Sequence, residues 1–197
     1  MRLVRRLGMV AVVTAIALGL GSEATASAAP APVTPVSSVQ LDSYVGSWFQ
    51  VASIPQIFEI QCARNVRATY TAEPDGTVGV VNTCRTYFGT TSRVSGRARV
   101  ENAPANSVLT VSFVKLFGRQ IYLGGPNYEI VGLDPQYNWA VVVSPDRGSA
   151  FVLSRTPALT GAQMTDIRGV LTGNGVSPCS LTVTRQDGGA AGGGRFC

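Results

Sequence analysis

The chain has 197 residues, of which 45% are hydrophobic and 14% charged, which is enough for one domain with a sizeable core. Its formal charge of +5 is a mild excess of scattered basic residues, so the composition argues against a nucleic-acid-binding protein. Because the sequence contains no histidine, it excludes haem ligation through histidine and disfavours a metal site built around its four cysteines.

The N-terminus has the pattern of an export signal. Three arginines within the first six residues precede an apolar run over residues 7–20, and Ala26 and Ala28 give the small-residue cleavage pattern. We therefore predict a signal peptide over residues 1–28. No cysteine lies near the cleavage site, so the sequence predicts a secreted, extracellular protein without a lipid anchor.

The folded domain is expected to begin at Val39, after a disordered leader over residues 29–38 that is rich in Ala, Pro, Val, Thr and Ser. Residues 41–45 predict a short helical turn, which Gly46 breaks because glycine accepts a positive φ at little cost. A strand over residues 47–53 follows and carries Trp48. The loop over residues 54–62 contains Ile57, Phe58 and Ile60.

The next segments alternate between apolar and polar residues, which is typical of amphipathic strands. Three such strands are expected over residues 65–71, 78–82 and 91–101, and a tight turn at residues 74–76 joins the first two. The side chains that share the inner face are Val66, Ala68, Tyr70, Val78, Val80, Asn82, Val94, Gly96, Ala98 and Val100.

Further strands are expected over residues 109–113, 128–133, 139–143 and 150–155, and turn residues separate the last three. A long loop over residues 115–127 holds Phe117, Ile121 and Tyr122 among glycines.

A helix follows these strands. Thr160 is its expected N-cap, Gln163 completes a capping box, and Gly173 ends it. A short strand over residues 180–185 and a glycine-rich tail over residues 187–197, expected to be loose except where a disulfide would hold it, complete the chain.

The four cysteines of an exported chain are expected to form two disulfides. The local pairing joins Cys62 to Cys84 and Cys179 to Cys197, and a competing pairing joins Cys62 to Cys197. The spacing leaves both open.

Eight amphipathic strands in series have two common solutions, a sandwich or a closed barrel. Meander connectivity favours an all-β fold, an eight-stranded antiparallel up-and-down β-barrel with one C-terminal α-helix, because closure removes exposed strand edges. The inner face mixes glycine, alanine and valine with a few aromatic residues, which favours a cavity with aromatic walls over a core filled by large side chains.

Four motifs in order resemble those of lipocalins, most closely the bacterial lipocalin and apolipoprotein D branch. They lie at residues 46–48, 133–137, 144–147 and 153–157, and the resemblance covers residues 39–186. It implies a barrel that is open at one end and carries a hydrophobic ligand, and it implies that Trp48 and Arg155 stack at the closed end. The chain departs from the family in two respects: it lacks the cysteine that anchors many bacterial members, and it has Leu-Asp-Pro where the wider family has Thr-Asp-Tyr.

Pattern and resemblance together give a set of candidate ligand-binding residues. Asn82 is the polar exception on a dry face, suited to orient a head group or to bond with Tyr70 or a trapped water. No cofactor is expected. The candidate set is Val66, Ala68, Tyr70, Val80, Asn82, Ala98, Val111, Phe113, Tyr128, Ile130 and Phe151.

The leading hypothesis is a secreted, monomeric binding protein that carries, stores or scavenges a small hydrophobic ligand such as a fatty acid, lysolipid or isoprenoid. Transient contact with a membrane surface is also expected. One alternative is a barrel whose rim binds another protein through the loop over residues 115–127. In this loop, Phe117, Ile121 and Tyr122 either form an apolar lip at the cavity entrance or only pack on the rim. A lipid-modifying enzyme is the other, although a chain without histidine or a G-x-S-x-G elbow offers little catalytic machinery.

Overall fold

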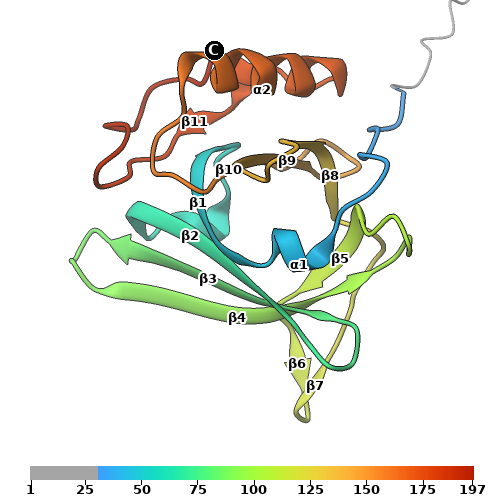
Figure 1. The fold of residues 1–197 in the computed structure, drawn as a ribbon. Helices are drawn as coiled ribbons and strands as arrows, with labels where there is room; N and C mark the ends of the chain where they lie inside the picture. Colours follow the sequence, from blue (N-terminus) through green and yellow to red (C-terminus); the bar gives the residue numbers. More distant parts are fainter. Residues whose placement is uncertain (1–30) are drawn as a thin grey trace, which may run out of the picture.

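The computed structural model describes residues 31–197, so the predicted signal peptide over residues 1–28 lies outside the described residues. Eight antiparallel strands form the closed barrel seen in Figure 1, and the pairing of the first with the last completes the ring. This architecture confirms the predicted fold. The barrel strands are β1 (Gly46–Ser53), β2 (Cys62–Ala72), β3 (Val78–Thr86), β4 (Thr91–Val100), β5 (Val108–Ser112), β8 (Tyr128–Leu133), β9 (Trp139–Val143) and β10 (Ala150–Ser154).

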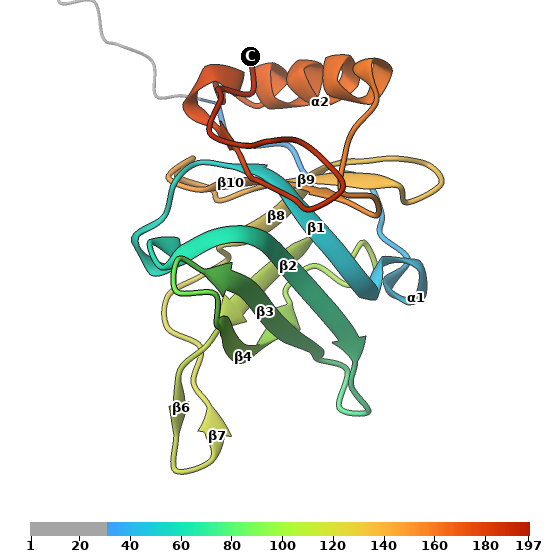
Figure 2. The same cartoon turned by 90° about the vertical axis from the view of Figure 1, so that its left-hand side faces the viewer.

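Short elements accompany the barrel. Helix α1 (Leu41–Tyr44) precedes β1, and the 3₁₀ turn η1 (Ile57–Glu59) lies between β1 and β2. The loop over residues 115–127 contains an unexpected two-stranded hairpin, β6 (Lys115–Leu116) and β7 (Arg119–Gln120). Figure 2 shows this hairpin projecting away from the barrel.

Helix α2 (Gly161–Gly173) lies outside the barrel across β8 and β9 (Figure 1). The predicted capping box is present. The Gln163 backbone N–H donates to Thr160 Oγ1 at 3.2 Å, and the Thr160 backbone N–H donates to Gln163 Oε1 at 2.9 Å. The helix approaches the sheet closely at Gly132, where an added Cβ would lie 2.7 Å from Val170 Cγ1. Two hydrophobic clusters result, one under the helix around Ile167 and one inside the barrel around Trp48.

Both ends of the described chain pack against the barrel. The described part of the leader predicted over residues 29–38 contacts the barrel: Val33 is buried under α2, and the Val36 backbone N–H donates to the Ile130 carbonyl at 2.8 Å. The C-terminal tail, which the Cys179–Cys197 disulfide holds at its end, folds back on β11 (Thr182–Val183) and buries Phe196. The few apolar side chains of both segments find their partners only on the assembled barrel.

The disulfides have the local pairing. Cys62 is joined to Cys84 between β2 and β3, and Cys179 in the turn η2 (Pro178–Ser180) is joined to Cys197. The competing pairing of Cys62 with Cys197 is wrong. Disulfides of this kind are typical of proteins outside the cytosol. Within residues 31–197, none of the helices has the length and hydrophobicity needed to cross a membrane.

Candidate ligand-binding cavity

The closed end of the barrel is built on Trp48 and Arg155. The Trp48 ring is fully buried, and its Nε1 donates to the Tyr44 carbonyl at 2.8 Å. The Arg155 guanidinium lies 3.7 Å above this ring, and it caps the C-terminal end of α1. Its nitrogens donate to the carbonyls of Ser43, Tyr44, Val45 and Ser47 at 2.8 to 3.2 Å.

Three tyrosine hydroxyls meet above this closed end. The Tyr128 hydroxyl lies 2.8 Å from that of Tyr44 and 2.8 Å from that of Tyr70. Burial raises the pKa of Tyr70 to about 12 and raises the pKa values of the other two well above 10, so all three keep their protons. Two hydrogen bonds use two of the three hydroxyl protons, which leaves one O–H free to donate.

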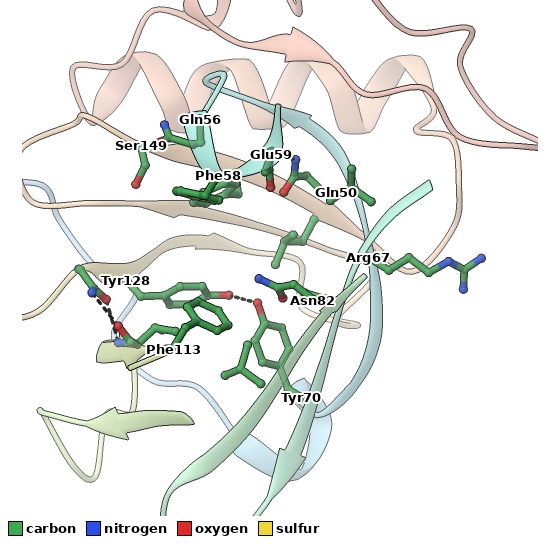
Figure 3. Close-up of a pocket in the computed structure, with 17 residues that line it drawn as sticks. Gln50, Gln56, Phe58, Glu59, Arg67, Tyr70, Asn82, Phe113, Tyr128 and Ser149 are labelled. Atoms are coloured by element: carbon green, nitrogen blue, oxygen red, sulfur yellow. Dashed lines mark hydrogen bonds between the residues drawn. The ribbon is translucent and has the colours of Figure 1, made fainter. Parts of the chain in front are cut away.

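A cavity of about 280 Å³ opens above the tyrosine cluster (Figure 3). Its walls come from six of the barrel strands, and its upper end is bordered by η1 and by the loops before β8 and β10. The residues that line it are Gln50, Gln56, Phe58, Glu59, Val66, Arg67, Ala68, Tyr70, Val80, Asn82, Val111, Phe113, Asn127, Tyr128, Ser149, Phe151 and Leu153.

Most of the predicted ligand-binding residues line this cavity. The exceptions are Ala98 and Ile130, which face a space of only about 10 Å³ nearer the closed end, around Tyr44. The lower barrel is therefore a filled core and the upper barrel is open. The predicted residues that reach the cavity are Val66, Ala68, Tyr70, Val80, Asn82, Val111, Phe113, Tyr128 and Phe151.

Sequence reasoning missed several lining residues. Gln50 and Leu153 share strand parity with Trp48 and Phe151, so alternation alone was sufficient to find them. Phe58 and Glu59 come from η1, where no periodic pattern exists, and only the fold of the loop brings them over the mouth (Figure 3).

Asn82 carries an unsatisfied acceptor. Its Oδ1 atom is buried without a hydrogen-bond partner, and the nearby Tyr70 hydroxyl bonds to the hydroxyl of Tyr128. Figure 3 shows the Asn82 amide between Tyr70 and the upper wall. A buried acceptor of this kind is costly unless a water or a ligand donor reaches it.

Gly96 allows Phe113 to pack closely against β4. A Cβ at this position would collide with the Ser112 carbonyl and lie 2.6 Å from the Phe113 ring. The missing side chain therefore leaves room for the close approach of Phe113, rather than enlarging the cavity directly.

Glu59 is the acidic residue of the cavity wall. Its carboxylate accepts a hydrogen bond of 3.0 Å from Gln50 Nε2, which also donates to Ser53 Oγ. Burial raises the pKa of Glu59 above its ordinary value of 4.5, and the bond from Gln50 opposes that shift.

The rim around the mouth is apolar and exposed. Large hydrophobic side chains stand in water on η1 and its loop, on the β3–β4 turn and along the segment from Phe113 to Leu123. The predicted lip residues Phe117, Ile121 and Tyr122 do not line the cavity: Phe117 is 96% exposed in the β6–β7 turn, and Tyr122 lies under Arg99 at 4.8 Å. The exposed set on these loops is Ile57, Phe58, Ile60, Tyr87, Phe88, Phe113, Val114, Leu116, Phe117 and Leu123.

A closed antiparallel barrel with a filled base, a capping tryptophan–arginine pair and an open apolar cavity defines a small-ligand-binding barrel. The lipocalin-like domain family model matches residues 39–186, which is most of the chain, and the protein therefore belongs to the lipocalin family. Members of this family are generally proteins that bind hydrophobic ligands rather than enzymes.

Two relatives and one solved structure illustrate the likeness. The outer membrane lipoprotein Blc of Escherichia coli is 31% identical over 159 residues, which cover 79% of this chain and 84% of that protein. Mouse apolipoprotein D is 27% identical over 160 residues, covering 79% of this chain and 82% of that protein. The structure of insecticyanin from the tobacco hornworm Manduca sexta has a TM-score of 0.62 at 17% identity, covering 84% of this chain and 94% of that one, and it shows the shared fold.

Proposed function

We propose that this lipocalin is an exported carrier that takes up one small apolar molecule, of the size of a fatty acid, lysolipid or isoprenoid, and performs no catalysis. The open cavity above the filled base carries the proposal, because its walls are mostly aliphatic and aromatic. Both disulfides and the predicted signal peptide support a location outside the cytosol.

Apolar burial is the expected driving force for binding. Each CH₂ group removed from water contributes about 0.8 kcal/mol, so a decyl chain gains about 8 kcal/mol before association costs of at least about 4 kcal/mol. Phe113 and Phe151 line the cavity from strand ends on opposite sides of Tyr128 in the sheet order, and a charge on either wall opposes this gain.

Native mass spectrometry of the protein from culture supernatant, followed by solvent extraction, tests the proposal. We expect a stoichiometric apolar molecule to be released from the wild type and to be lost from Phe113→Asp and Phe151→Asp. Phe88→Asp is the matched control, because Phe88 is 94% exposed and does not line the cavity. An empty protein that also fails to take up decanol, or equal loading of all three variants, would contradict the proposal.

A second function concerns the rim. We propose that the exposed apolar loops touch a lipid surface while ligand is exchanged, because a ring of apolar side chains surrounds the mouth. Lys115 and Arg119 flank the most exposed of these side chains, Phe117, which suits an anionic bilayer.

Co-sedimentation with phosphatidylglycerol vesicles tests this contact. We expect binding that Phe117→Asp weakens, whereas Gln136→Asp leaves it unchanged, because Gln136 lies in the β8–β9 turn beside Arg155 at the closed end. Equal sedimentation of the two variants, or none by the wild type, would refute membrane contact and leave a protein partner as the use of the rim.

A further inference from the structure

The cavity interior holds an acidic side chain and no basic side chain that faces it. Among the seventeen residues that line it, Glu59 carries the only carboxylate, and Arg67 carries the only cationic group. Arg67 does not face the interior: its guanidinium lies 3.9 Å over the Phe49 ring, and Figure 3 shows it pointing away from the cavity. The interior therefore contains an anion without a counter-ion.

The groups on the other side of Glu59 do not supply that counter-ion either. An outer groove between η1 and the C-terminal tail shares Gln50 and Glu59 with the cavity, and its ionisable groups are Tyr87 and Arg185. No salt bridge joins Glu59 to an arginine or lysine within residues 31–197, and its carboxylate is held by the neutral Gln50 amide. The Gln50 amide donates to Oε2 of Glu59, and no group within residues 31–197 donates a hydrogen bond to its Oε1.

We propose that the cavity selects an apolar molecule bearing a protonated amine over one bearing a carboxylate, with Glu59 as the counter-ion at the mouth. This inference rests on the proposed carrier function and narrows its ligand class, since a fatty-acid carboxylate at the same place would meet Glu59 with like charge. An ammonium group would instead donate a hydrogen bond to Oε1 of Glu59 and offset the free-energy cost of burying the Glu59 carboxylate.

The surrounding residues favour the same chemistry. Phe58 is adjacent to Glu59 and lies over the cavity in Figure 3, so an ammonium held by Glu59 lies within reach of an aromatic face. Deeper in the cavity, the unpartnered Oδ1 of Asn82 is a second acceptor, which suits a ligand whose far end carries a hydroxyl or N–H group. Neither acceptor suits a carboxylate.

Titration calorimetry with decylamine, decanol and decanoic acid at pH 7 tests the proposal, because the three probes share one chain and differ in head-group charge. We expect decylamine to bind about tenfold more tightly than decanol, and decanoate to bind more weakly than decanol. Glu59→Gln should reduce decylamine affinity to the level of decanol and raise the affinity for decanoate, with decanol binding unchanged.

Glu129→Gln is the matched control. Glu129 is a half-buried glutamate on β8 that does not line the cavity, so the same change of charge there should leave the order of the three probes intact. Equal affinities of the wild type for decylamine and decanol would overturn the selectivity while leaving the carrier function in place. Failure of all three probes to bind would overturn the carrier function as well.

A second measurement needs no variant. The other ionisable side chains that line the cavity and the groove are Arg67, Tyr70, Tyr87, Tyr128 and Arg185, so Glu59 is the one carboxylic acid among them. Decylamine affinity of the wild type should therefore fall toward that of decanol as acid neutralises Glu59. A decylamine affinity that stays constant down to pH 4 would contradict the role of Glu59.

Discussion

Removal of the Arg155 side chain tests how the closed end is held together. The stacking of the guanidinium on Trp48 at 3.7 Å contributes about 1 to 2 kcal/mol at a partly buried site. Its hydrogen bonds to the carbonyls at the end of α1 add about 1 to 2 kcal/mol in total, since water replaces part of them at the surface. Arg155→Met should therefore lower the free energy of unfolding by about 2 to 4 kcal/mol.

Urea unfolding followed by tryptophan fluorescence and by far-ultraviolet circular dichroism measures this loss. Arg155→Lys should give an intermediate loss, because an ammonium group keeps the charge but cannot both stack and reach several carbonyls. Arg99→Met is the matched control: Arg99 is half exposed, pairs with Glu101 at 2.9 Å and stacks on Tyr122, so its removal should cost under about 1 kcal/mol. Equal small losses for Arg155→Met and Arg99→Met would refute the structural role of the stack.

Three further predictions concern the cavity. Tyr128→Phe removes both hydrogen bonds of the tyrosine cluster and should cost about 2 kcal/mol in urea unfolding, whereas Tyr44→Phe removes one and should cost about half as much. Gly96→Ala should displace Phe113 and lower both thermal stability and decanol affinity, and Gly125→Ala, where an added Cβ meets nothing, should alter neither. Because burial raises the folded-state pKa of Glu59, the folded protein binds its proton more tightly than the unfolded chain, so stability should fall as the pH rises from about 4.5 through that raised pKa. Glu59→Gln should remove this decline and be more stable than the wild type at pH 7. A variant that is less stable at pH 7 would show that ionised Glu59 stabilises the fold, which would refute the prediction.

Much of the fold was predictable because its signals are local. The alternation of Val66, Ala68 and Tyr70 with polar neighbours fixes which face of β2 is inside, and the Thr160–Gln163 capping box fixes where α2 begins. The cysteine spacing left the disulfide pairing open until the barrel brought Cys62 beside Cys84. The β6–β7 hairpin was missed because its strands are two residues long, too short to show a period.

The sequence by itself favoured a closed barrel over a sandwich, and its alternation indicated the inner face of most strands. Only the tertiary structure decided how far from the closed end each inner side chain lies, because strand parity gives the face and not the height. Ala98 and Tyr128 were therefore both predicted to face a ligand, although one belongs to the filled base and the other to the cavity floor. The position of Glu59 is likewise a tertiary property, since an aperiodic turn has no preferred face until neighbouring strands give it a surface to cover.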